Sequence, residues 1–194
     1  MTAPTTDHQS ARPLPAPSVS PPRVAAVRAA AALVWAAALV LALGGAELQA
    51  GTEVPVAAAA LLASYPLIDV VATALTVARA DGVERVTRAN LAVSSLAVVV
   101  IAAAAFGFDA GTTLVAFGGW AALSGALQFT VALRARRDGR QLPMLISGGL
   151  STVAGLSFIA AGTGTEADLA TLAGYMTVGA LLSLIWAYRT SRAG

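Results

Sequence analysis

The chain has 194 residues, of which 57% are hydrophobic and only 11% are charged, and its mean hydropathy is +0.76. Soluble domains carry about 25% charged residues, so this composition excludes an ordinary soluble domain and predicts a multi-pass membrane protein. The absence of cysteine excludes disulfides and thiolate metal sites. The net charge is only +2, so the charge balance gives no reason to expect a nucleic-acid partner.

Residues 1–23 are expected to form a disordered cytoplasmic tail. They contain six prolines among serine, threonine and alanine, and they include the only histidine, His8. A segment of this composition cannot bury enough apolar surface to fold. The transmembrane domain is therefore expected at residues 24–194.

The first membrane span is predicted at about residues 24–46, because residues 29–46 carry no charge. Arg28 lies just before this uncharged run, and its side chain is expected to reach back to the membrane interface. A cleaved signal peptide ending near Ala46 or Ala50 is the alternative. The long preceding tail, and the leading helix that each later repeat needs, favour a span.

Five further apolar segments are each long enough to cross the hydrocarbon core. They are predicted at about residues 54–78, 90–107, 112–133, 143–162 and 168–188. The fold class is therefore an all-α membrane protein with six transmembrane helices.

The arginines predict the orientation of these spans. They lie in the tail and the start of span one, in the links after spans two and four, and at the C-terminus. The other links carry only acidic charges, namely Glu47, Glu53, Asp109, Glu166 and Asp168. Because positive loops stay in the cytoplasm, both termini are expected there, with the chain in the inner or plasma membrane.

A 55-residue internal repeat divides the six spans into three tandem helical hairpins. Its marked positions recur at spacing i, i+4, i+8 in spans two, four and six, and so lie on one face of each helix. They are Tyr65, Asp69 and Thr73, then Trp120, Ser124 and Gln128, then Tyr175, Gly179 and Ser183. Polar groups without partners are costly in hydrocarbon. The repeat therefore predicts a pseudo-threefold bundle with spans two, four and six inside.

Close helix packing is the simpler explanation for many of these small residues. Small side chains at four-residue spacing let membrane helices approach each other. Such positions are Ala121 and Gly125 in span four, Ser147, Ser151 and Gly155 in span five, and Gly179, Ser183 and Ala187 in span six.

Asp69 is the only acidic residue well inside a span. It lies ten residues before Arg79, which places it about 15 Å along the helix from that end. A charge at that depth costs about 2.5–3.5 kcal/mol on insertion scales, so the residue needs an explanation.

The functional interpretation is an intramembrane site that binds a proton or a cation. Its candidate residues are Asp69, Tyr65, Thr73, Ser124, Gln128 and Pro66, the last because proline frees a backbone carbonyl and can kink the helix. The alternative is a protonated or hydrogen-bonded aspartate that fixes the register of the bundle. The lack of a second buried charge for a relay favours this alternative.

Catalytic, cofactor and metal sites are not predicted. The only histidine lies in the tail, there is no lysine, and the glycine pairs fall in apolar runs rather than in phosphate-binding loops. The chain is therefore not expected to be an enzyme.

Two segments carry a family resemblance: residues 115–128 (VAFGGWAALSGALQ), and residues 143–151 (PMLISGGLS) with Gly155. With the arginine cluster between them they resemble the HdeD-like membrane proteins, over about residues 90–190. The resemblance implies a six-span bacterial inner-membrane protein of short transmembrane repeats and a link to acid resistance. It supplies no catalytic residue.

Two functional hypotheses follow. One is a non-enzymatic HdeD-like protein that serves envelope or acid stress by assembling with itself or with other membrane proteins. The other is a small proton-coupled transporter or channel that uses Asp69. A cavity reaching Asp69 favours transport, whereas a dry packed centre favours the structural role.

Overall fold

The computed structural model describes residues 22–46, 48–78, 85–134, 142–165 and 167–192. These residues form six helices: α1 (Pro22–Leu43), α2 (Val56–Val77), α3 (Arg85–Gly107), α4 (Ala110–Arg134), α5 (Leu142–Gly162) and α6 (Ala170–Ser191). Each is long and apolar enough to cross a membrane, which confirms the six predicted spans. Residues 1–21 of the predicted tail lie outside the described residues, as does most of both arginine-rich links.

Most helix boundaries differ from the predicted ones by one to three residues, and two of the differences have a clear physical cause. Helix α1 ends at Leu43 rather than near Ala46, because Gly44 and Gly45 adopt positive φ angles of 60° and 78° and end the helix there. Helix α3 begins at Arg85, five residues before the predicted start of its span. Hydropathy marks only the part of a helix that lies in hydrocarbon, whereas the helix itself continues into the polar region.

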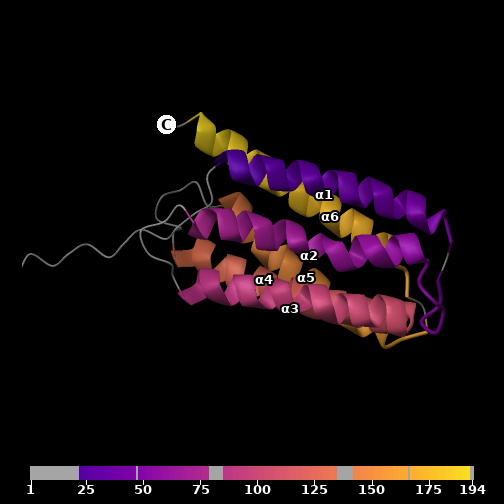
Figure 1. Cartoon of the computed structure of the whole chain (residues 1–194). Helices are drawn as coiled ribbons and strands as arrows, with labels where there is room; N and C mark the ends of the chain where they lie inside the picture. Colours follow the sequence, from indigo (N-terminus) through magenta and orange to yellow (C-terminus); the bar gives the residue numbers. More distant parts are fainter. Residues whose placement is uncertain (1–21, 47, 79–84, 135–141, 166, 193–194) are drawn as a thin grey trace, which may run out of the picture.

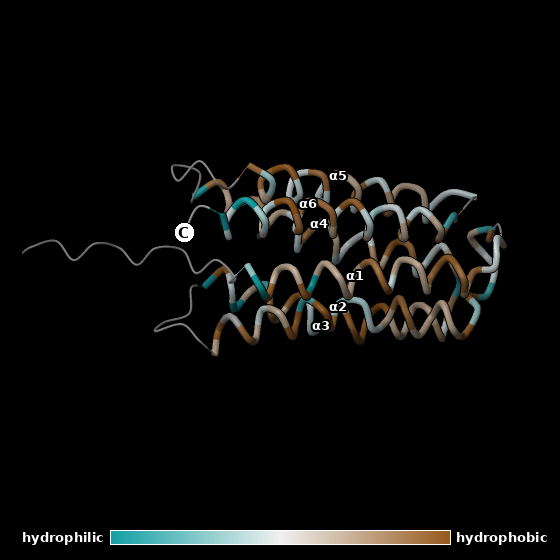
Figure 2. The backbone as a smooth tube through the Cα atoms, turned by 90° about the horizontal axis from the view of Figure 1, so that it is seen from above, coloured by the Kyte–Doolittle hydropathy of each residue, from teal (hydrophilic) through white to brown (hydrophobic). Residues whose placement is uncertain are grey.

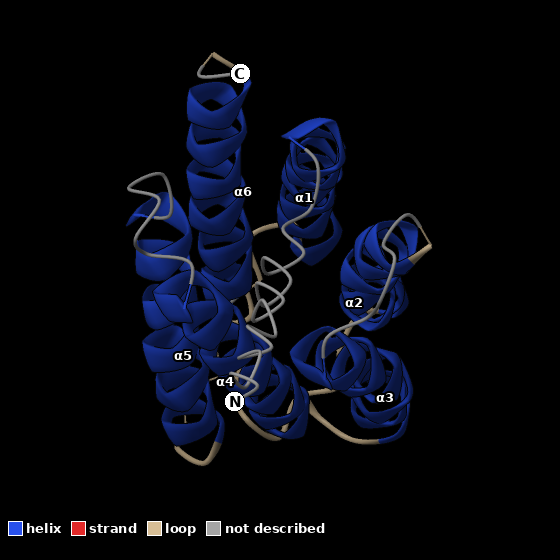
Figure 3. Cartoon of the chain, turned by 90° about the vertical axis from the view of Figure 1, so that its left-hand side faces the viewer, coloured by secondary structure: helices blue, strands red, loops and turns tan. Residues whose placement is uncertain are grey.

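The helices are arranged in sequence order around a ring that α6 closes against α1 (Figures 1 and 3). The most extensive packing joins α4 with α5, α1 with α6 and α2 with α3. The pairs expected as hairpins, such as α1 with α2, pack less extensively. The three-hairpin, pseudo-threefold arrangement therefore stays a prediction.

Glycines allow the backbones of α4 and α5 to approach each other very closely. A Cβ atom on Gly155 would lie 2.4 Å from the backbone nitrogen of Ala122, and one on Gly148 would lie 2.6 Å from that of Phe129. Only glycine fits at such a contact. The predicted packing role of small residues is therefore confirmed at this interface.

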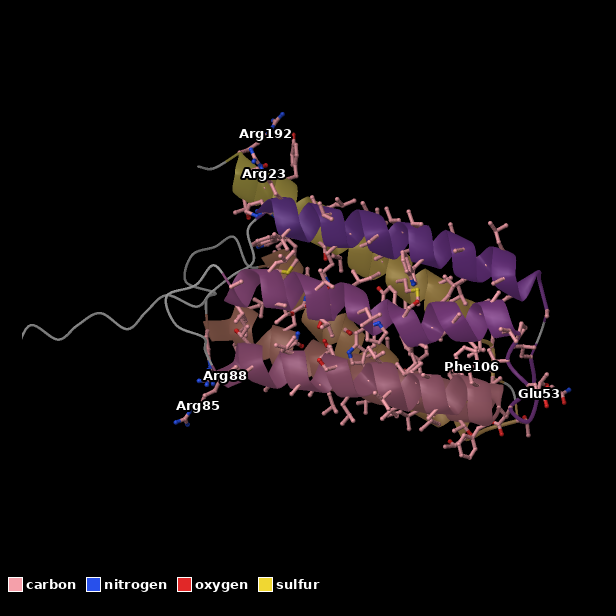
Figure 4. All side chains as sticks on the ribbon, viewed as in Figure 1. Arg23, Glu53, Arg85, Arg88, Phe106 and Arg192 are labelled. Carbon is pink, nitrogen blue, oxygen red and sulfur yellow. The ribbon has the colours of Figure 1, made fainter. Side chains whose placement is uncertain are left out.

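The end of the bundle away from the arginines is closed by its own loops. Figure 4 shows Arg23, Arg85, Arg88 and Arg192 at one end and Glu53 at the other. At the Glu53 end, the backbone of residues 48–52 bonds to both neighbouring connections: Ala50 N–H donates to the Thr165 carbonyl oxygen, and the Ala50 carbonyl oxygen accepts from Gly111 N–H.

The half of the bundle next to this closed end contains a packed apolar core. Leu39, Leu62, Ile101, Leu114 and Leu172 are all fully buried there. Exposed leucine, valine or isoleucine side chains occur on all six helices, as expected for helices in lipid. In Figure 2, hydrophobic residues, coloured brown, recur along the helices.

Candidate functional site

Asp69 forms an ion pair with Arg28. The Nη2 atom of Arg28 lies 2.8 Å from Oδ1 of Asp69. Asp69 is only 3% exposed, whereas the Arg28 side chain keeps 39% of its surface accessible. The pair joins α1 to α2 within the membrane-spanning part of the bundle, between six and eight residues from the arginine-side ends of these helices.

The other carboxylate oxygen of Asp69 is held by α3. Oδ2 accepts hydrogen bonds from Asn90 Nδ2 at 2.7 Å and from Ser94 Oγ at 2.6 Å. Asn90 and Ser94 are four residues apart and therefore lie on the same face of α3. Both oxygens of the carboxylate thus have partners, as a buried carboxylate requires.

A second set of bonds connects this centre to α4. The Trp120 indole Nε1–H donates to Ser94 Oγ at 3.1 Å, and the Ser124 hydroxyl donates to Asn90 Oδ1 at 3.2 Å. The Asn90 amide also donates to the Thr73 hydroxyl at 3.3 Å. Four helices, α1 to α4, therefore converge on Asp69.

The interfacial position predicted for Arg28 is wrong. Its guanidinium turns inward, because a carboxylate inside the bundle offers a stronger partner than the interface does. Asp69 nonetheless remains the only fully buried charged side chain among the described residues, because Arg28 keeps 39% of its side-chain surface accessible. Asp69 is paired, and a neutral form is not needed to explain its burial.

The predicted site residues are only partly brought together. Ser124 and Thr73 reach Asp69 through Asn90. Gln128 instead donates to the Met144 carbonyl at 3.4 Å, and Pro66 is buried within an uninterrupted α2.

Tyr65 belongs to an aromatic cluster rather than to the hydrogen-bonded network. Its ring centroid lies 5.7 Å from that of Trp120 and 5.8 Å from that of Phe117. Phe117 also contacts Tyr175 edge to face, with centroids 6.0 Å apart. The three repeated aromatics of α2, α4 and α6 therefore meet around Phe117, a residue that the repeat alone did not mark.

Three central residues, Arg28, Asn90 and Ser94, were missed by the sequence reasoning as partners of Asp69. The available signals were weak: Arg28 lies six residues inside α1, and Asn90 and Ser94 are polar residues at helical spacing in an apolar run. The position of Arg28 just before an uncharged run favoured an interfacial interpretation for that residue.

One cavity, of about 150 Å³, reaches from Asp69 towards the arginine-side ends of the helices. Arg28, Asn90 and Gln128 line it, and Val24 and Val131 mark its extent near those ends.

A second cavity, of about 330 Å³, lies between α1, α4, α5 and α6. Its lining joins polar groups with apolar ones such as Leu150 and Phe158. Four residues line both cavities: Arg28, Ser124, Gln128 and Ser183.

All nine repeated positions line one cavity or the other. At Gly179 a Cβ atom would meet nothing within 4 Å, so this glycine borders open space and does not serve close packing. The packing explanation therefore holds for α5 but is wrong for Gly179 of α6. The inward-facing polar positions surround a space large enough for a small molecule.

The described residues include no group of three or more metal-ligating side chains. Comparisons with protein-family models, curated proteins and solved structures find no match for this chain. The resemblance to HdeD-like proteins therefore stays a hypothesis.

Proposed function

We propose that this chain is a non-enzymatic membrane carrier for a small solute, with Arg28 and Asp69 as its coupling site. The observation that supports it is that two cavities share Arg28, whose partner in the ion pair, Asp69, is buried. An ionisable pair inside a membrane is costly, and such pairs typically mark a substrate or ion pathway.

An ion pair with a purely structural role would not need a cavity beside it. Here the Arg28 side chain lines both cavities, and the larger one has a volume at the lower end of the range for small-molecule pockets, about 300–1,000 Å³. The first cavity lies in the half near the arginines, and the second continues from Gln128 towards Phe158 and Thr171, near the Glu53 end, where the connecting loops close the bundle.

The same proposal includes the orientation in the membrane that the arginines predict. Arg23, Arg85, Arg88 and Arg192 lie at one end of the bundle, and this end is proposed to face the cytoplasm (Figure 4). The first cavity would then extend towards the cytoplasmic side, and the loop-closed end would face outwards.

Flux into proteoliposomes tests the proposal. Uptake of radiolabelled solutes of four classes (a sugar, an amino acid, a monocarboxylate and an alkali cation) is compared for the unmodified protein, Gly179→Leu and Gly119→Leu. Both glycines have free space at the Cβ position, but only Gly179 lines a cavity. We expect uptake of at least one class, lost in Gly179→Leu and kept in Gly119→Leu. Uptake of no class above that of protein-free liposomes would refute transport.

A second candidate function is the HdeD-like one, in envelope or acid stress through assembly rather than transport. The glycine-mediated packing of α4 on α5 favours it, because this packing lies in the two segments that carry the resemblance. In cells that depend on the protein for acid survival, Gly155→Leu should then abolish survival while Gly179→Leu has no effect. The opposite pattern would favour transport.

A further inference from the structure

The two cavities contain one positive and one negative side chain. Among the described residues, Arg28 is the only cationic side chain that lines either cavity, and Asp69 is the only acidic one. The other titratable groups facing the pair are Tyr65 on α2 and Tyr175 on α6. The described lining residues of α3, α4 and α5 include no titratable side chain. The net charge of the site is therefore zero when Asp69 is ionised.

This balance restricts what the site can bind. A proton added to Asp69 alone would leave the Arg28 guanidinium without a counter-ion inside the bundle, and an anion added alone would leave one uncompensated negative charge. Either state carries the high free-energy cost of an unpaired charge in a low-dielectric environment. A proton and a monovalent anion that enter together keep the site neutral.

The geometry allows this exchange. Arg28 contacts Asp69 through Nη2, and no other described acceptor bonds the rest of its guanidinium group. Arg28 is also a lining residue of both cavities. On the far side of Asp69, Oδ2 keeps its bonds from Asn90 and Ser94 when Oδ1 takes a proton. The carboxyl group thus stays in place while Arg28 becomes free for another oxyanion.

The shape and lining of the second cavity select the anion. A guanidinium binds a planar carboxylate through two parallel N–H···O bonds. Beyond Arg28 the cavity is bordered by apolar side chains of α5 and α6, including Leu150, Phe158 and Val178. Its volume of about 330 Å³ has room for roughly ten non-hydrogen atoms, taking about 30 Å³ for each as for water.

We infer that the site binds a small monocarboxylate with an apolar body on Arg28, together with one proton on Asp69. This inference rests on the proposed carrier function and names its substrate class. The proton comes from hydronium or from the acid form of the buffer, which is left as water or as the buffer's conjugate base. The Arg28–Asp69 ion pair breaks and an Arg28–substrate ion pair forms, so charge and atoms balance. Release of the acid and the proton restores the original pair.

Calorimetric titration of the purified full chain in lipid nanodiscs tests the inference. The probes are benzoate and its neutral isostere benzamide, measured in buffers of different ionisation enthalpy so that proton uptake is counted. We expect one proton taken up per benzoate bound. The dissociation constant for benzoate should rise about tenfold per pH unit between about pH 6 and about pH 8, as linkage to one proton requires. Benzamide should bind weakly and without proton uptake.

Variants assign these effects to the two residues. Asp69→Asn mimics the protonated carboxyl group, so benzoate should bind without proton uptake and independently of pH. Arg28→Gln should weaken benzoate binding about 10- to 100-fold, the range for losing a charge-assisted hydrogen bond. If either variant fails to fold, Gly179→Leu keeps the ion pair intact and should still abolish benzoate binding, whereas Gly119→Leu should not.

Several outcomes would overturn the inference: benzoate binding with no proton uptake, benzamide binding as tightly as benzoate, or undiminished binding to Arg28→Gln. Tighter binding of palmitate than of benzoate would overturn the assignment to a small acid, since the cavity has no room for the longer chain. Failure here is distinguishable from failure of the carrier proposal. Flux of another solute class that is lost in Gly179→Leu would support the carrier proposal and contradict the monocarboxylate assignment. Benzoate binding without flux of any solute would support monocarboxylate binding and contradict the carrier proposal.

Discussion

Arg28 and Asp69 are 41 residues apart in the sequence, yet Nη2 of the one lies 2.8 Å from Oδ1 of the other. Each charge explains the position of its partner. Asp69 could not remain ionised at this depth without a cation, and Arg28 has reason to leave the interface only because a carboxylate lies within the bundle.

Removing one member of this pair should destabilise the protein more than removing both. Asp69→Asn leaves the guanidinium without a counter-ion, and Arg28→Gln leaves the carboxylate without one. Because the Arg28 side chain keeps 39% exposure, we expect each to lower the free energy of unfolding by about 3 kcal/mol, the lower end for buried pairs. The double variant should recover more than half of the summed loss, so that it is more stable than either single variant. Unfolding in detergent, followed by circular dichroism, measures this, and single variants as stable as the unmodified protein would contradict it.

Ser94→Ala should lower the free energy of unfolding. It deletes the hydroxyl that donates to Asp69 Oδ2 and accepts from Trp120 Nε1–H. A hydrogen bond to a charged group contributes about 1.5–3 kcal/mol, and the unpaired indole adds to the loss. Ser157→Ala is the matched control, since that exposed hydroxyl bonds only to a carbonyl of its own helix. Equal unfolding free energies for the two variants would show that the network around Asp69 does not stabilise the bundle.

Gly155→Ala and Gly119→Ala should have opposite effects on stability. A methyl group on Gly155 would overlap the backbone of α4, so α4 and α5 must separate, at a cost of about 1–3 kcal/mol. Gly119 has open space, so alanine there should stabilise the helix by up to about 1 kcal/mol. Thermal unfolding of the two purified variants compares them directly, and a destabilised Gly119→Ala would conflict with the packing described for α4.

The orientation can be checked with single cysteines, since the chain has none of its own. Thr52→Cys lies in the closed end of the bundle and Ser191→Cys at the arginine-side end. In intact cells, a membrane-impermeant maleimide should label Thr52→Cys only. Ser191→Cys should react only after the membrane is permeabilised. Labelling of Ser191→Cys in intact cells would reverse the proposed topology.

The six helices could be predicted from sequence because span length and hydropathy are local properties. The helix ends were less predictable. Helix α1 ends because Gly44 and Gly45 adopt positive φ angles, and helix α3 begins at Arg85, before its apolar segment. A hydropathy average detects neither backbone conformation nor a polar helical extension.

The candidate site could be predicted only in part. Asp69 is conspicuous as a lone carboxylate in an apolar run, and the repeated aromatics and polar residues do line the central cavities. Their partners could not be assigned, because the 55-residue repeat relates α2, α4 and α6, whereas Asp69 bonds to residues of α1 and α3. A repeat identifies equivalent positions, and hydrogen bonds join positions that are not equivalent.

The sequence by itself therefore determined that this is a six-helix membrane protein with an unusual carboxylate at Asp69. The length of each apolar segment and a charged residue within one of them can both be read directly from the order of the residues. Only the tertiary structure decided that Arg28 neutralises that carboxylate and that two cavities meet beside the pair. The physical reason is that charge pairing and empty volume depend on distances between different helices, which composition and periodicity do not specify.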